Sequence, residues 1–337
     1  MLIDRRAVLA GGLAILAAPA PALAVEGPSI RRIGKGLDQI VEPNAPVDTI
    51  ASGIKWAEGP AWLRDRKCLL FSDPPANVMR RWTASGGVSV FLSPSGAAGT
   101  DPKLVREPGS NGLAPDGRGG LLIADSGGRA ITRLDLATKR KTVLVGRYKG
   151  KRFNSPNDLH ISRSGAIYFT DPPYGFADGD RSPLKELEVN GVYRWAPDGE
   201  AVLVDGTLTR PNGVALSPDE RRLYVSVSDE TAPRIMVYDL DARGMPRDRR
   251  VLLDARPMLA GGAPGLPDGM KVAADGTLFC SAPGGMLIMT AEAEPLGLIH
   301  DGQAIANCCF GEDGRTLFMT SSDRVLRLRI KINGWRA

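Results

Sequence analysis

Apolar residues in this chain come in short runs, and the runs follow one another in a regular order. A short first run leads to a turn-forming sequence such as Pro-Asp-Gly, a second apolar run follows, and a third alternates apolar with polar residues. Runs of this length, bounded by Gly, Pro, Asn and Asp, are typical of β-strands joined by tight turns. The clearest second runs are LLIAD, IYFTD, LYVSV, LFCSA and LFMTS, at residues 121–125, 167–171, 223–227, 278–282 and 317–321.

A polar residue opens each group of runs, so the chain contains an internal repeat. Six segments begin with Asn, Asp or Glu, often beside Gly or Pro, just before the first strand. A repeat of 39 to 56 residues that contains several antiparallel strands is typical of a β-propeller, and six repeats indicate six blades. β-Sandwiches and single barrels fit less well, because they do not require one polar residue at the same place in every repeat. The six residues, here called the ring residues, recur at intervals of 39 to 56 positions: Glu58, Asn111, Asn157, Asn212, Asp268 and Asn307.

The ring residues are candidates for a metal site. In a propeller the innermost strand of each blade runs along the central channel, so the residues that open these strands converge at one channel mouth. Two carboxylates and several amides form an oxygen-rich set that suits a hard divalent cation, Ca²⁺ foremost, with Mg²⁺, Mn²⁺ or Zn²⁺ as alternatives. Each pair such as Asn-Gly is separately explained by turn chemistry. The recurrence of a polar residue at the same place in every repeat is what favours a metal-binding channel.

Other polar and aromatic residues near these positions have simpler explanations. Neighbouring side chains of a strand point to opposite faces, so Asp158 is expected to support the site or the backbone instead of binding metal. Asn307 directly precedes Cys308-Cys309, and this segment is better explained by packing in the core than by metal coordination. Four aromatic residues near the expected blade-top loops are candidates to line an apolar pocket, but ordinary loop packing is the favoured explanation. They are Trp56, Phe153, Tyr174 and Phe176. With two histidines and no Gly-x-Ser-x-Gly sequence, a serine-hydrolase triad is not supported.

Composition agrees with one large globular domain. The chain has 337 residues, of which 43% are hydrophobic, and it is far from the composition of a disordered protein. Its formal net charge is +5, but Lys and Arg are scattered along the sequence, so we do not expect nucleic-acid binding. The four cysteines lack the spacing of a zinc site, and buried free thiols are expected.

Residues 1–24 have the pattern of an export signal. A charged start precedes an apolar run, and Ala22-Leu23-Ala24 resembles a cleavage site. Arg5-Arg6 suggests the twin-arginine route, with the ordinary secretory route as an alternative. The run at residues 7–18 is too short to span a bilayer, so no membrane anchor is expected after cleavage. The expected organisation is a signal peptide at 1–24, an extension at 25–49 and the propeller at 50–337 of a periplasmic or secreted protein.

The repeated motifs resemble those of a known family. They are Glu58-Gly59-Pro60, SNGL at 110–113, SPND at 155–158, RPNGV at 210–214, Pro267-Asp268-Gly269 and NCCFG at 307–311. Together, over roughly residues 50–330, they are similar to the gluconolactonase and regucalcin (senescence marker protein) family of six-bladed propellers with a divalent metal in the channel. The resemblance implies Glu58, Asn212 and Asp268 as metal ligands. It also implies Asn157 at or near the metal and Asn111 near the substrate.

The resemblance implies hydrolysis of a lactone or a related ester. A channel cation with open positions polarises a carbonyl and lowers the pKa of a bound water. Asp268 is the candidate base that takes the proton from water, and Asn111 and Asn157 are candidate substrate-binding residues. Residues 124–127 read Ala-Asp-Ser-Gly where a Glu-His pair is frequent in the family, which leaves the substrate open. A phosphotriesterase-like or arylesterase activity, and a non-catalytic binding propeller, are the alternatives.

Overall fold

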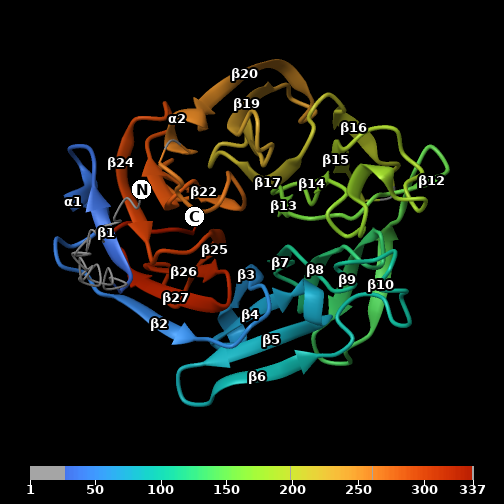
Figure 1. The fold of residues 1–337 in the computed structure, drawn as a ribbon, viewed down its shortest axis with the longest axis horizontal. Helices are drawn as coiled ribbons and strands as arrows, with labels where there is room; N and C mark the ends of the chain where they lie inside the picture. The colour runs from blue at the N-terminus through green and yellow to red at the C-terminus, as the bar shows by residue number, and fades with distance from the viewer. Residues whose placement is uncertain (1–26, 198, 260, 336–337) are drawn as a thin grey trace, which may run out of the picture.

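The strands form a closed ring of antiparallel sheets around one axis (Figure 1). The structure, a computed structural model, describes residues 27–197, 199–259 and 261–335. In this part of the chain the ring has six sheets, each of four or five strands, and each sheet is one blade. The prediction of a six-bladed β-propeller is confirmed. The expected export signal at 1–24 lies outside the described residues.

The first three blades follow the chain from the channel outwards, and their innermost strands are β3, β7 and β13. Blade 1 contains β3 (Glu58–Leu63), β4 (Cys68–Asp73), β5 (Val78–Thr83) and β6 (Gly87–Leu92). Blade 2 contains β7 (Leu113–Pro115), β8 (Gly120–Asp125), β9 (Ala130–Asp135) and β10 (Lys141–Val145). Blade 3 contains β13 (Leu159–Ile161), β14 (Ile167–Asp171), β15 (Gly191–Trp195) and β16 (Val202–Asp205).

The last three blades repeat this order with innermost strands β17, β21 and β25. Blade 4 contains β17 (Pro211–Leu216), β18 (Arg222–Val227), β19 (Arg234–Leu240) and β20 (Pro246–Asp254). Blade 5 contains β21 (Met270–Val272), β22 (Leu278–Ala282), β23 (Gly285–Met289) and β24 (Pro295–His300). Blade 6 contains β25 (Ile305–Gly311), β26 (Thr316–Ser321) and β27 (Arg324–Arg329).

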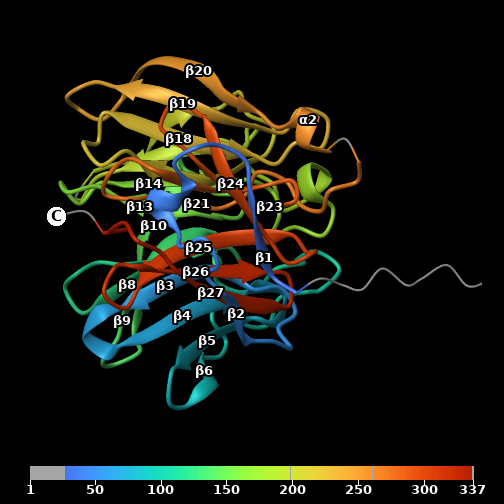
Figure 2. The same cartoon turned by 90° about the vertical axis from the view of Figure 1, so that its left-hand side faces the viewer.

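The N-terminal segment completes the last two blades. Strand β1 (Ser29–Arg32) pairs with β24 at the outside of blade 5, as the side view in Figure 2 shows. Strand β2 (Val47–Ala51) pairs with β27 and is the fourth strand of blade 6, so the two ends of the chain close the ring in one sheet. The expected boundary at residue 50 falls inside β2. The segment expected as an extension therefore supplies two outer strands of the propeller.

Short elements lie between the blades or between strands of one blade. They are the hairpin β11 (Arg147–Tyr148) and β12 (Lys151–Arg152), the helices α1 (Leu37–Ile40) and α2 (Arg256–Leu259), and the 3-10 helices η1 (Arg64–Arg66), η2 (Pro74–Ala76) and η3 (Gly179–Arg181). No helix among the described residues has the length and apolar character needed to cross a membrane.

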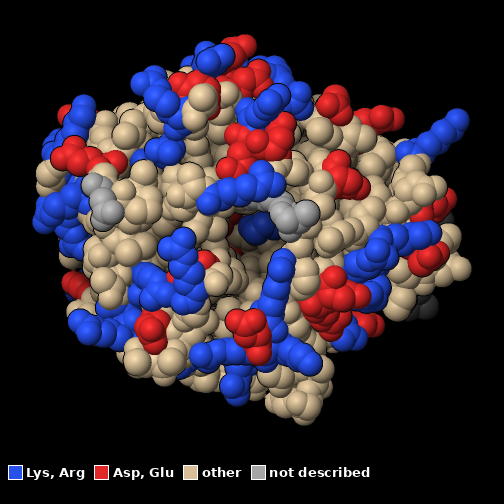
Figure 3. All heavy atoms as spheres, turned by 180° about the vertical axis from the view of Figure 1, so that it is seen from behind, with Lys and Arg blue, Asp and Glu red and all other residues tan. Residues whose placement is uncertain are grey.

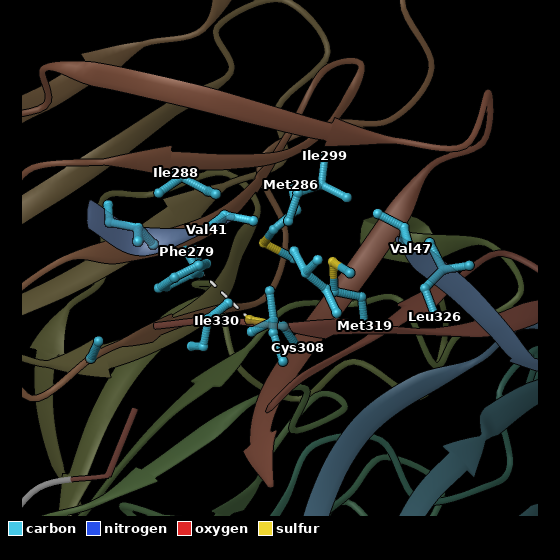
Figure 4. Close-up of a cluster of buried hydrophobic side chains, with 14 of the residues drawn as sticks. Val41, Val47, Phe279, Met286, Ile288, Ile299, Cys308, Met319, Leu326 and Ile330 are labelled. Carbon is cyan, nitrogen blue, oxygen red and sulfur yellow. Dashed lines mark hydrogen bonds between the residues drawn. The ribbon is translucent and has the colours of Figure 1, made fainter. Parts of the chain in front are cut away.

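Apolar side chains of neighbouring blades fill the space between the sheets. Figure 4 shows one such cluster, in which Phe279 of blade 5 packs near Cys308 and Met319 of blade 6. The thiol of Cys308 lies 3.7 Å from the carbonyl oxygen of Phe279 and donates to it. All four cysteines are buried and free, which confirms the expectation of buried thiols. This packing holds the inner strands, and the residues that open them, in fixed positions around the axis.

Candidate active site

Five of the six ring residues line one cavity at a mouth of the central channel. The cavity has a volume of about 860 Å³. Four of the five are buried, and Asp268 is partly exposed to the cavity. The structure thus brings together every residue that the sequence singled out as a metal ligand, base or substrate contact: Glu58, Asn111, Asn157, Asn212 and Asp268.

The sixth ring residue and Asp158 have structural roles instead. The side-chain oxygen of Asn307 accepts a hydrogen bond from the N–H of Cys308 at 2.8 Å, and Asn307 does not line the cavity. The carboxylate of Asp158 accepts from the N–H groups of Leu159 at 2.9 Å and Val214 at 3.3 Å. Asp158 therefore joins the inner strands of blades 3 and 4, as the alternation of side chains predicted.

Hydroxyl groups on the second strands hold the ring residues of the next blade in place. Each hydroxyl is buried and donates a hydrogen bond to the backbone carbonyl of a ring residue. The pairs are Ser72 with Asn111 at 2.7 Å, Thr170 with Asn212 at 2.6 Å, and Ser226 with Asp268 at 2.6 Å. The sequence analysis missed these groups, although a signal was present. A Ser or Thr occupies the same place in LLFSD, IYFTD and LYVSV, immediately after three apolar residues.

A chain of hydrogen bonds orients Asn212. Its amide nitrogen donates to the hydroxyl of Ser228 at 2.9 Å, and this hydroxyl donates to the carbonyl oxygen of Pro267 at 2.6 Å. The amide oxygen is thereby turned away from Ser228. Among the described residues, this oxygen and one carboxylate oxygen of Asp268 are buried without a hydrogen-bond partner. Two buried acceptors in one cavity require a donor or a cation.

The carboxyl groups at this mouth repel one another. Burial is the main cause that raises the pKa of Asp268 well above its ordinary value, and the charges of Glu58 and Asp158 raise it further. Burial also raises the pKa of Glu58, with Asp158 and Glu107 adding to the effect and the N–H of Gly59 opposing it. The pKa of Glu107 rises to about 7, mainly through burial and against the attraction of neighbouring Arg106. Positive charge placed between Glu58 and Asp268 would allow both to ionise.

These observations test whether the cavity fits a divalent cation. Two carboxylates and amide oxygens are the donors that Ca²⁺ and similar hard cations prefer, and two of these oxygens have no other partner. Across the described residues, no group of three His, Cys, Asp or Glu side chains is placed to hold a metal. The amides of Asn157 and Asn212 line the same cavity as the two carboxylates and offer further oxygen donors. The donor set fits a hard cation.

Acidic side chains outnumber basic ones in the lining of the cavity. Of the described residues that line it, six are Asp or Glu and two are Arg. Both arginines are already paired: Arg106 lies 3.3 Å from a carboxylate oxygen of Glu107, and Arg210 forms an ion pair with Asp180. The cavity therefore has a surplus of negative charge, which a divalent cation would reduce but not reverse.

The other mouth of the channel is separate from this site. A second cavity, of about 780 Å³, is lined by Trp62, His160, Lys271 and Trp335 among others. On the face seen in Figure 3 the molecule is hollowed at its centre, and a basic side chain is visible inside the hollow. The ammonium of Lys271 donates to the carbonyl oxygen of Met270 at 3.0 Å and lies 3.4 Å from the side-chain oxygen of Asn307.

Some cavity residues were not expected from the sequence. Trp56 and Tyr174 line the cavity, so for these two aromatic residues the favoured explanation of loop packing was wrong and the alternative, pocket lining, is confirmed. Phe153 and Phe176 are buried, and for them packing is confirmed. Glu107 comes from a loop, and the directions of loop side chains leave no regular pattern in a sequence.

The fold and the cavity define a class of protein: a six-bladed propeller with an acid- and amide-lined cavity at one channel mouth. The family model of the SMP-30/gluconolactonase/LRE-like region matches residues 56–323, and the chain belongs to this family. It is 52% identical over 311 residues to a gluconolactonase of Zymomonas mobilis, with 90% of this chain and 87% of the relative covered. The family resemblance expected from the motifs is confirmed.

Solved structures agree with this assignment. A gluconolactonase from Xanthomonas campestris superposes with a TM-score of 0.77 at 33% identity, and covers 90% of this chain and 95% of its own. Regucalcin from Agrobacterium tumefaciens, described as a calcium-binding protein, has a TM-score of 0.67 at 19% identity, covering 86% and 96%. The second similarity is evidence for the fold alone.

Proposed function

We propose that the protein hydrolyses the ring ester of a sugar-type lactone, using one divalent cation held by Glu58, Asn157, Asn212 and Asp268. The observation that carries the proposal is the convergence of these four residues in one cavity, with unpartnered oxygens on Asn212 and Asp268. Membership of the gluconolactonase family and the 52% identical relative support a lactone as the substrate. Ca²⁺ is the first candidate, and Mg²⁺, Mn²⁺ or Zn²⁺ are alternatives.

The reaction adds water to the lactone carbonyl carbon and breaks the bond to the ring oxygen, which gives the open hydroxy acid. A cation bound here polarises the carbonyl and lowers the pKa of water. Asp268 is a carboxylate that lines the cavity beside the other candidate cation ligands, so we assign it as the group that accepts the proton from the attacking water. Asn111 and Asn157 offer amide groups that bind the hydroxyls of the substrate.

The charge of the cavity favours an uncharged lactone. Six acidic side chains and two paired arginines line it, so an anionic group on the substrate would be repelled even with a divalent cation in place. A neutral lactone with several hydroxyls can use the same carboxylates as hydrogen-bond acceptors. We therefore propose an uncharged aldonolactone as the preferred substrate.

The test is a hydrolysis panel with the cation-loaded protein. The panel contains gluconolactone, a pentonolactone, an aromatic lactone and a phosphotriester. Turnover of the aldonolactones, lowered at least about 100-fold by Asp268→Asn, is the expected result. The matched control is Asp275→Asn, which makes the same change at an exposed turn of blade 5 where the side chain accepts from the N–H of Thr277. Turnover of the phosphotriester alone would overturn the lactone assignment, and no turnover at all would favour a binding propeller.

We also propose that the protein is exported, with residues 1–24 removed. The charged start, the apolar run and the Ala22-Leu23-Ala24 site support this proposal. Cell fractionation and N-terminal sequencing of the mature protein test it. A mature chain that begins near residue 25 in the periplasm or the medium is expected, and an intact N-terminus in the cytoplasm would contradict it.

A further inference from the structure

Tyr174 places a phenol hydroxyl in the cavity beside the candidate cation ligands. It follows β14 in the sequence Asp-Pro-Pro-Tyr-Gly and lines the cavity that also contains Asn212 and Asp268. Its hydroxyl oxygen is buried, and among the described residues it has no hydrogen-bond partner. A buried hydroxyl without a partner costs free energy, so this group needs an explanation.

The neighbours of the hydroxyl are already engaged with other groups. Ser228 and Asn212 lie near enough to influence the pKa of Tyr174, but neither makes a hydrogen bond of ordinary geometry with it. The Ser228 hydroxyl donates to the carbonyl of Pro267 and accepts from the Asn212 amide. The ordinary pKa of a tyrosine hydroxyl is about 10, well above neutral pH. The phenol therefore stays protonated and is a hydrogen-bond donor.

The loop that carries Tyr174 is held on both sides. The guanidinium of Arg106 donates to the carbonyl oxygen of Tyr174 at 2.7 Å. The hydroxyl of Ser155 donates to the carbonyl of Pro172 at 2.5 Å and accepts from the N–H of Gly175 at 2.9 Å. Two prolines before the tyrosine further restrict the backbone. The position of the phenol is thus prepared before any ligand binds, which is what a group that stabilises developing charge requires.

The unpartnered atoms in the cavity are of two kinds. The oxygens of Asn212 and Asp268 are acceptors, and a cation satisfies them. The Tyr174 hydroxyl is a donor in this arrangement, and a cation repels its proton. Its partner must be an acceptor that lies next to the cation ligands. In a lactone hydrolase, the acceptor that meets this requirement is the carbonyl oxygen of the substrate.

We propose that Tyr174 is a catalytic residue that donates a hydrogen bond to the carbonyl oxygen of the lactone. This inference rests on the proposed lactonase function. When water adds to the carbonyl carbon, the electron pair of the C=O bond moves to this oxygen, and the hydrogen bond strengthens as the negative charge grows. The phenol keeps its proton throughout. As the C=O bond re-forms, the bond to the ring oxygen breaks and its electron pair leaves with that oxygen. The ring oxygen takes up the proton that Asp268 received from water, so no net proton transfer involves Tyr174.

The test is Tyr174→Phe, which removes the hydroxyl and keeps the ring. We expect kcat to fall about 100-fold, as for the loss of one oxyanion donor, while the affinity for Ca²⁺ stays unchanged. The thermal midpoint should not fall, because the variant removes a buried hydroxyl that has no partner. A gluconolactam has a carbonyl that accepts a hydrogen bond, but its ring resists hydrolysis. Its affinity for the variant, measured by calorimetry, should be about tenfold lower than for the wild type. The matched control is Tyr148→Phe, at a partly exposed tyrosine that does not line the cavity. It should change none of these quantities.

Three results would overturn the inference. An unchanged kcat in Tyr174→Phe would show that the hydroxyl does not act on the reacting oxygen. A loss of Ca²⁺ affinity that matches the loss of kcat would show that Tyr174 instead supports the cation ligands. Wild-type protein that binds Ca²⁺ but opens no lactone would contradict the proposed function, and the inference would fall with it. The wild-type assay therefore separates failure of the function from failure of the role of Tyr174.

Discussion

Glycine follows four of the ring residues, and the neighbouring blade occupies the space that a side chain would need. A methyl carbon at Gly213 would lie 2.2 Å from the carbonyl oxygen of Asp268, and one at Gly59 would lie 2.0 Å from that of Asn111. No side chain fits at these distances. The repeated Asn-Gly and Asp-Gly pairs thus reflect the close approach of one ring residue to the next, in addition to turn chemistry.

Gly213→Ala tests this explanation. The obstructing atoms belong to the backbone of Asp268 and Gly269, so they cannot move aside cheaply, and the variant should lose about 2–4 kcal/mol of unfolding free energy. Urea unfolding measures the loss. The control is Gly146→Ala, where a methyl group meets its nearest neighbours at 3.6 and 3.7 Å, and stability should change little. Equal stability of both variants would contradict the close-approach explanation.

Asp171 should make the stability depend on pH. Burial raises its pKa to about 7, against the opposing hydrogen bonds of the Asn154 and Ser155 N–H groups and the charges of Arg129 and Lys185. The folded state therefore binds a proton more tightly than the unfolded state. Stability should fall as pH rises from about 4 to about 7, by at most about 1.4 kcal/mol per pH unit from this group.

Asp171→Asn checks that pH dependence. Asparagine can still accept from the Asn154 N–H through its carbonyl oxygen, and its amide replaces a carboxylate oxygen that has no partner. The difference in unfolding free energy between variant and wild type should grow in favour of the variant as pH rises through this range. A constant difference between pH 4 and pH 7 would mean that Asp171 does not titrate there.

At the scale of elements, hydroxyls on the second strands of blades 1, 3 and 4 connect these blades to the next one. Ser226 of β18 is fully buried, donates to the carbonyl of Asp268 at 2.6 Å and accepts from the N–H of Gly213 at 2.7 Å. One hydroxyl therefore fixes the backbone at ring positions of two blades. This arrangement explains how short inner strands can hold five side chains in a common cavity.

Ser226→Ala should both destabilise the protein and weaken the site. Two buried backbone groups lose their partner, which costs about 2–4 kcal/mol in total. Calorimetry should also show weaker Ca²⁺ binding, because the backbone of Asp268 loses the hydrogen bond from Ser226 that fixes its position. Ser164→Ala, at an exposed serine of blade 3, is the control and should leave both quantities unchanged. Wild-type Ca²⁺ affinity in Ser226→Ala would mean that the inter-blade link does not position Asp268.

The elements also show what the sequence could predict and what it could not. The six repeats and the position of Glu58, Asn212 and Asp268 followed from recurrence alone, because a propeller repeats the same geometry in each blade. The position of Tyr174 in the cavity could not be predicted from recurrence, because this residue lies in a loop whose direction depends on contacts with Arg106 and Ser155. Periodic positions are predictable, whereas loop side chains depend on contacts between distant parts of the chain.

At the scale of the whole molecule, the ring of blades is closed by the pairing of two strands, β2 and β27, that lie far apart in the sequence. Val47 pairs with Leu328 and Asp48 with Arg327, whose side chains form an ion pair at 2.9 Å. The sequence analysis placed this strand mostly in an extension because β2 lacks the repeated motif and its partner lies at the other end of the chain. Because one sheet contains strands from near both ends of the chain, the ring cannot open without breaking the hydrogen bonds of that sheet.

The net charge of the cavity predicts selection among lactones. A neutral aldonolactone should have a kcat/KM at least about tenfold higher than the same lactone with a phosphate group, because the lining remains acidic with a cation bound. Steady-state kinetics at low ionic strength measure the ratio. Added salt should narrow the gap by screening the charges. A preference for the phosphorylated lactone would contradict this account of the cavity.

The most direct test of the whole account is the rate of gluconolactone hydrolysis by metal-stripped protein as Ca²⁺ is added, with cation binding followed in parallel by calorimetry. The account predicts almost no turnover without the cation. Turnover should rise with the occupancy of one site per chain, and Asp268→Asn should lose both binding and activity. Hydrolysis that persists at the full rate after the cation is stripped, or a saturated cation site with no lactone turnover, would contradict it.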